Sequence, residues 1–80
     1  MDNFAEIKKM IANVLAVDEE EIVTEAHLQD DLGGDSVAVM RLAETIGTHF
    51  GIELLIEDIV DLDNVGELVE LVASKVSSTV

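Results

Sequence analysis

The sequence contains no cysteine, proline, tryptophan or tyrosine, and its two phenylalanines are its only large aromatic residues. The absence of cysteine excludes disulfides and thiolate metal sites. No apolar run approaches the roughly 18 residues that a transmembrane helix needs. The first residues also lack the basic start and the apolar block of a signal peptide. We therefore expect a cytoplasmic protein without a membrane span.

Basic residues are scarce. Four lysines and arginines stand against 18 acidic residues, which gives a net charge of −14. Such a surface repels nucleic acid and anionic membranes, and it attracts basic protein surfaces. Acidity also keeps a small, aliphatic-rich domain in solution. The charge therefore excludes nucleic acid as a partner without selecting a function by itself.

Apolar residues recur at helical spacing in the first half of the chain. The spacing predicts an amphipathic helix over residues 4–16, opened by Asn3 and Glu6 at the separation of a capping box. A second apolar stripe predicts a helix over residues 36–50. Gly51 follows this helix and is expected to adopt a left-handed conformation that ends it.

A long loop is predicted between these helices, because residues 22–32 show no sustained period. The acidic cluster Asp18–Glu21 is interpreted as a solvated turn at its start. Scattered apolar residues are expected to fix the loop onto the core. These residues are Ile22, Val23, Ala26, Leu28 and Leu32.

The second half of the chain predicts one short and one long helix. Residues 52–56 are apolar enough for a strand, but no partner strand is visible, so we expect a buried loop. A short helix is expected within residues 57–62. Asn64, with an acidic residue three positions on, caps the last predicted helix, which leads into a frayed tail at 77–80. The prediction is an all-α bundle of three main helices and one short helix, in a single domain over residues 1–80.

Two kinds of site fail on spacing. Ser36 as a hydrolytic nucleophile needs a neighbouring base, yet His49 lies about 20 Å along the same helix at 1.5 Å per residue. His27 is not excluded by geometry, but it is interpreted as a loop surface residue, and no nucleophile-elbow motif is present. Residues 61–66 begin like a calcium loop, but Val72 occupies the position that requires a glutamate. We expect neither an enzyme nor a metal site.

The dipeptide Asp35-Ser36 follows two glycines and precedes the second predicted helix. Aspartate is a favoured N-cap, which places Ser36 at the first helical position. Backbone N–H groups and the helix dipole favour negative charge at this end. Ser36 is therefore placed to carry an anion, although these two residues alone also describe an ordinary capped helix.

Three segments together resemble the acyl carrier proteins: residues 32–37, with the sequence Leu-Gly-Gly-Asp-Ser-Val, residues 50–53 and residues 64–68. The resemblance covers nearly the whole chain in order and spacing. It implies that Ser36 receives 4′-phosphopantetheine from coenzyme A through a phosphopantetheinyl transferase. The thiol of this arm then holds an acyl group as a thioester, and Asp35 assists the metal-dependent attack by the transferase.

The resemblance also implies a docking surface on the second helix, where acidic side chains stand beside apolar ones and face basic partner enzymes. The matching residues are Asp35, Val37, Met40, Arg41 and Glu44. Ala38 and Arg41 stand where acidic residues are common in the family, and Leu55 replaces a frequent proline. A reversed charge in a docking surface repels the usual partners. We therefore expect a specialised carrier, such as one for polyketides, rather than a housekeeping fatty-acid carrier.

The implied partners are the transferase and a set of acyl-transfer and condensing enzymes with basic docking surfaces, which act on a monomeric carrier. The acyl chain is expected to fold back between the helices. Its candidate lining residues are Met40, Ile46, Ile59 and Val65. Two alternatives stay open: an aminoacyl or peptidyl carrier, which shares the serine and the fold, and an acidic helical interaction module that carries no arm.

Overall fold

The computed structural model describes residues 3–33 and 35–78, apart from the side chains of Ser36 and Ser78. In these residues the elements are α1 (Phe4–Leu15), a 3₁₀ turn η1 (Glu19–Glu21), α2 (Ser36–Phe50), α3 (Ile56–Val60) and α4 (Val65–Ser78). No strand occurs in the described segments. The predicted bundle of three main helices and one short helix is confirmed. None of the helices in this part of the chain is long and apolar enough to cross a membrane.

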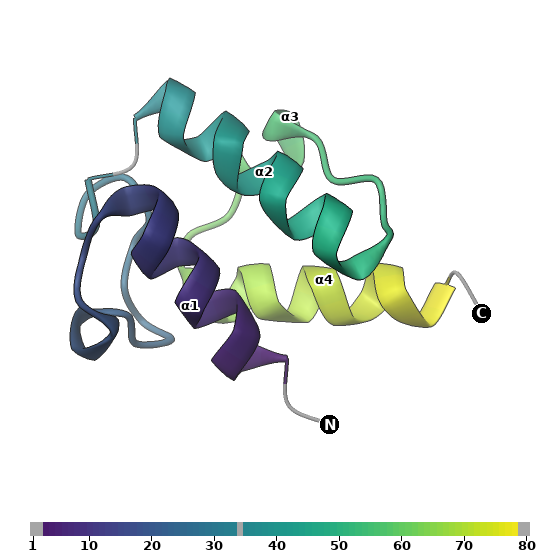
Figure 1. Ribbon diagram of the computed structural model, residues 1–80, viewed down its shortest axis with the longest axis horizontal. Helices are drawn as coiled ribbons and strands as arrows, with labels where there is room; N and C mark the ends of the chain where they lie inside the picture. The colour runs from purple at the N-terminus through teal and green to yellow at the C-terminus, as the bar shows by residue number, and fades with distance from the viewer. Residues whose placement is uncertain (1–2, 34, 79–80) are drawn as a thin grey trace.

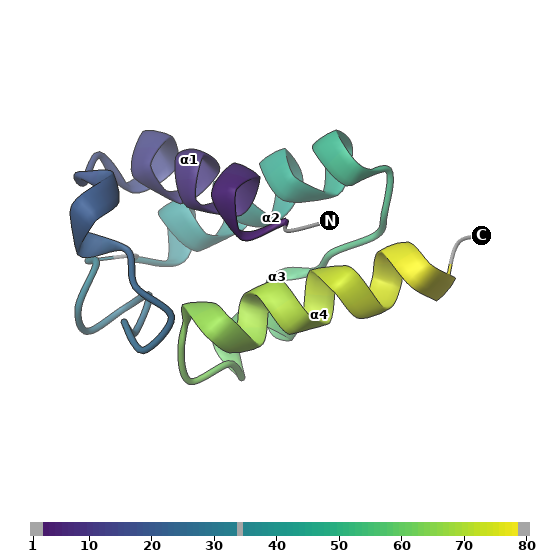
Figure 2. The same cartoon turned by 90° about the horizontal axis from the view of Figure 1, so that it is seen from below.

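Helices α1 and α2 lie side by side, and the view turned by 90° shows α4 beneath this pair (Figures 1 and 2). The three helices bury their apolar stripes against one another. The fully buried side chains of the main helices are Ile7, Ile11, Val39, Leu42, Ile46, Val65, Leu68 and Val72. The apolar stripe predicted for α2 is therefore confirmed, and it includes Leu42.

The long loop between α1 and α2 is tied to the core, as predicted. Its anchors Ile22, Ala26, Leu28 and Leu32 are buried, whereas Val23, expected among them, is exposed. The backbone also holds the loop. The N–H groups of Val65 and Gly66 donate to the carbonyls of Ala26 and Thr24, both at 2.9 Å. These N–H groups belong to the first turn of α4 and have no acceptor within that helix. The loop therefore supplies the hydrogen-bond acceptors that the start of α4 lacks.

The predicted capping box at the start of α1 is wrong. The helix begins at Phe4 as expected, but Asn3 has helical backbone angles and its side chain makes no capping hydrogen bond. The Glu6 carboxylate instead lies 3.2 Å from Nε2 of His49 on α2. Glu6 therefore contacts His49 on α2 instead of capping its own helix.

The start of α4 follows the prediction and its end does not. Asn64 Oδ1 accepts the N–H of Glu67 at 2.9 Å, which confirms the N-cap. The helix continues to Ser78, so Ser77 and Ser78 are helical rather than the start of a frayed tail. Residues 79–80 lie outside the described part of the chain.

Candidate functional site

Helix α2 begins with a side-chain cap. Asp35 has an extended backbone conformation and its Oδ1 accepts the N–H of Ala38 at 2.9 Å. The Asp35 carbonyl accepts the N–H of Val39 at 2.9 Å, the first hydrogen bond of the helical ladder. Ser36 is therefore the first residue of the helix, as predicted. The side chain of Ser36 lies outside the described part of the structure.

A histidine organises the turn before this helix. His27 Nδ1 accepts the N–H of Gln29 at 3.2 Å and the N–H of Asp30 at 3.0 Å. The His27 N–H in turn donates to Oδ2 of Asp31 at 2.7 Å. The interpretation of His27 as a simple surface residue is therefore corrected. The imidazole is half-buried, and it holds the backbone of the turn through Gln29 and Asp30. The signal available in the sequence was His27, whose ring nitrogen can accept a hydrogen bond, followed four residues later by the carboxylate of Asp31.

Acidic side chains surround the turn that leads into α2. Asp30, Asp31 and Asp35 are all exposed. Gly33 has a φ of 73°, a left-handed conformation that a glycine adopts without strain. Gly34, part of the same predicted motif, lies outside the described residues. The helix start thus presents a positive dipole end within a negative surface.

The predicted docking residues share one outer face of α2. Val37 is 60% exposed and Met40 is 49% exposed. Arg41 and Glu44, the charged positions of this face, are exposed as well. The exposure of Met40 corrects its assignment to a chain-lining position. Its proposed neighbours there, Ile46, Ile59 and Val65, are buried.

One comparison decides the family. The family model described as "Phosphopantetheine attachment site" matches residues 5–72. The chain belongs to this family. It is a carrier protein for covalently attached 4′-phosphopantetheine, and such carriers work with a phosphopantetheinyl transferase and with biosynthetic enzymes.

The start of α2 fits the group that this carrier holds. Asp35 occupies one first-turn N–H, that of Ala38. The other N–H groups of a first turn have no acceptor within a helix and favour an anion. A phosphodiester carries one negative charge, which a helix N-terminus would stabilise and a helix C-terminus would not.

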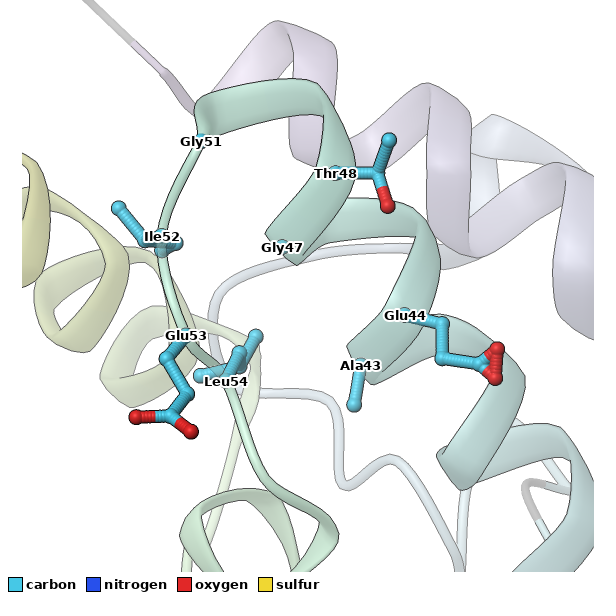
Figure 3. Close-up of a pocket in the computed structure, with 8 residues that line it drawn as sticks. All are labelled: Ala43, Glu44, Gly47, Thr48, Gly51, Ile52, Glu53 and Leu54. Atoms are coloured by element: carbon cyan, nitrogen blue, oxygen red, sulfur yellow. The ribbon is translucent and has the colours of Figure 1, made fainter.

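The carrier has a shallow groove on the flank of α2 nearest residues 52–54 (Figure 3). Its lining residues are Ala43, Glu44, Gly47, Thr48, Gly51, Ile52, Glu53 and Leu54. Leu54 points toward the helix, while Glu44 and Glu53 project from opposite walls (Figure 3). The groove therefore has apolar side chains such as Ala43 and Leu54 between its walls, and the carboxylates of Glu44 and Glu53 lie at its edges.

Gly47 lets the chain after α2 pack closely against that helix. A Cβ atom at this position would lie 2.9 Å from the backbone oxygen of Ile52. Sequence reasoning missed this residue. The available signal was a glycine inside a helical pattern, which lowers helix stability unless packing requires it.

A second groove of the carrier lies between α1 and α2. Its lining residues are Met10, Asn13, Val14, Arg41, Glu44 and Thr45. Glu44 lines both grooves, so it stands on the ridge between them. Arg41 gives the second groove a positive charge that the first one lacks. The two flanks of α2 thus differ in electrostatic character.

Proposed function

We propose that this chain is an acyl carrier protein whose phosphopantetheine arm is attached to Ser36. The observation that carries the proposal is positional. Ser36 is the only serine within the matched residues 5–72, and it is the first residue of a capped helix. An anionic ester at that point is stabilised by the helix terminus.

Each residue at the helix start has a distinct part in the proposal. The Ser36 oxygen forms the ester with the phosphate of the arm. Asp35 fixes the direction of the first turn through Ala38, and its exposed carboxylate assists a metal-dependent transferase. The thiol at the end of the arm holds the acyl group, and partner enzymes supply the chemistry. The carrier itself is not an enzyme.

The proposed docking surface is the outer face of α2. Asp35 and Glu44 attract basic surfaces of acyl-transfer and condensing enzymes, while the exposed Val37 and Met40 add apolar contact. Long-range attraction is strong because the net charge is −14. The same charge opposes self-association, so we propose a cytoplasmic monomer with residues 1–80 as one domain.

Acyl cargo is favoured over aminoacyl or peptidyl cargo by the acidity and by the Gly-Gly-Asp-Ser sequence before α2. A specialised pathway, such as polyketide synthesis, is favoured over housekeeping fatty-acid synthesis by Arg41, Ala38 and Leu55. The side chains of Arg41 and Leu55 are exposed, so both meet an approaching partner. A housekeeping fatty-acid carrier is the alternative pathway within the same proposal.

The test separates the two kinds of cargo. The protein is first converted with coenzyme A and a broad-specificity transferase, and attachment of the arm is verified by intact mass. The product is then offered malonyl-coenzyme A with a malonyltransferase or, separately, amino acids with an adenylating enzyme and ATP. We expect a thioester from the first reaction alone. Loading by amino acids alone would assign an aminoacyl carrier, and failure to accept the arm would leave an acidic interaction module.

A further inference from the structure

The outer face of α2 carries an arginine at its centre. Val37, Met40, Arg41 and Glu44 recur at intervals of three, one and three residues, which places them on one side of the helix. All of them are exposed. Arg41 lies five residues after Ser36, about 7.5 Å along the axis at 1.5 Å per residue. An enzyme that receives cargo from Ser36 therefore covers Arg41 as well.

Arg41 has no partner in the described part of the chain. Two of the lysines differ from it: Lys75 lies 3.8 Å from an Asp58 carboxylate oxygen, and Lys8 lies 5.3 Å from the ring centre of Phe4. Glu44, one turn from Arg41, makes no ion pair with it among these residues. An unpaired guanidinium on a chain of net charge −14 therefore keeps its donors available.

The groove on the α1 flank gives this arginine a defined neighbourhood. Met10 and Val14 supply apolar surface from α1, Asn13 and Thr45 supply polar groups, and Glu44 adds a carboxylate at the ridge. A guanidinium binds a carboxylate through a planar pair of hydrogen bonds, and apolar surroundings strengthen such a pair. Arg41 thus suits a short acidic side chain of a partner, while Glu44 in the same groove suits a basic one.

We propose that Arg41 and the α1–α2 groove bind a carboxylate side chain on the docking surface of the partner enzyme. This inference rests on the proposed carrier function and adds the chemistry of its partner. The partner surface presents an aspartate or glutamate to Arg41, beside basic groups that face Asp35 and Glu44. A uniformly basic surface is repelled by Arg41, so this position selects among enzymes that otherwise share a carrier.

A second copy of the chain is the competing occupant, and the charge argues against it. Two copies would bring together two surfaces of net charge −14 each. Like charges of that size oppose association, most strongly at low ionic strength. A separate enzyme with mixed charges meets no such general repulsion.

The experiment is a charge exchange with a fatty-acid ketosynthase of basic docking surface as the probe. Binding of the arm-bearing wild type is compared with that of Arg41→Glu and Arg41→Gln. Each lysine and arginine of the ketosynthase docking surface is also changed singly to glutamate. We expect Arg41→Glu to bind the unchanged enzyme about tenfold more tightly, with Arg41→Gln between. One glutamate variant of the enzyme should reverse that order.

Lys9→Glu is the matched control, because it changes the net charge equally from an exposed position that does not line the groove. Equal effects of Arg41→Glu and Lys9→Glu, with normal attachment of the arm, would overturn this inference alone. So would the absence of any ketosynthase variant that couples to Arg41. A dimer weakened by Arg41→Glu in sedimentation would assign the face to a second copy. Failure of arm attachment would instead count against the carrier function.

Discussion

The two ends of α2 are held by different kinds of contact. At its N-terminal end, polar side chains bind backbone N–H groups: Asp35 accepts from Ala38 at 2.9 Å and His27 accepts from Asp30 at 3.0 Å. At its C-terminal end, Gly51 turns the chain in a left-handed conformation and Leu54 returns into the core. The N-terminal end is fixed by side-chain hydrogen bonds, whereas the C-terminal end combines packing with backbone hydrogen bonds, such as that from the Ile52 N–H to the Gly47 carbonyl at 3.0 Å.

This difference separates presentation of the arm from stability of the fold. A hydrogen bond contributes about 0.5–1.5 kcal/mol net, whereas distortion of a packed region costs about 1–3 kcal/mol. Changes near Ser36 should therefore alter attachment of the arm more than folding. Changes near Gly47 should do the reverse. The following substitutions test this contrast.

Gly47→Val should have the largest effect. Its Cβ would lie 2.9 Å from the Ile52 oxygen, so the segment after α2 must move. We expect a loss of about 2–3 kcal/mol in urea unfolding. Thr48→Val is the matched control, since it places the same β-branched residue at the next position of the helix, where the side chain is exposed. Similar midpoints for both variants would contradict the close packing at Gly47.

Asp35→Ala should have an intermediate effect on stability and a large one on arm attachment. Loss of the cap on Ala38 should cost about 1 kcal/mol. The transferase rate should fall further than the folded fraction does. Asp35→Asn keeps an acceptor oxygen but removes the charge, so it should retain stability and lose rate. Retention of full rate by Asp35→Asn would show that the carboxylate charge has no part in attachment.

His27→Ala should cost about 1 kcal/mol, because it removes the acceptor for two backbone N–H groups. His27→Asn should lose less, since asparagine oxygens accept from the backbone in similar turns. Hydrogen exchange at the Asp30 amide gives the local readout. Exchange at that amide unchanged by His27→Ala would contradict the role given to the imidazole.

The smallest effect is expected for Glu6→Gln. The Glu6 carboxylate lies 3.2 Å from the His49 ring, and both side chains are about half exposed, at 53% and 47%. Exposed ion pairs contribute about 0–1 kcal/mol, so a shift below about 0.5 kcal/mol is expected in thermal unfolding. A double-mutant cycle with His49→Gln isolates the pair. A coupling above about 1 kcal/mol would mean that this contact is a main support of the α1–α2 packing.

Local signals in the sequence predicted much of the fold and the helix start. Asp35, Gly51 and Asn64 act through their nearest neighbours in the chain, so residue type and spacing were enough to place these caps. The apolar period likewise placed Ile7, Ile11 and Ile46 in the core, since a helix has one face to bury.

Contacts between distant segments were not readable in the same way. Glu6 was expected to cap its own helix, but it meets His49, which lies 43 residues away in the sequence. Gly47 is required because the backbone oxygen of Ile52 packs closely against it. The spacing of apolar residues in the sequence does not predict this contact. The two grooves beside α2 arise only when α1 and residues 52–54 pack against it.

The most direct test of the account is to locate the arm. After incubation with coenzyme A and a transferase, trypsin releases residues 10–41, which contain Ser36 as their only serine. We predict that this peptide gains the mass of one phosphopantetheine and that fragment ions place it on Ser36. Ser36→Ala should gain nothing. Modification of another residue, or full modification of Ser36→Ala, would contradict the central claim that the start of α2 carries the arm.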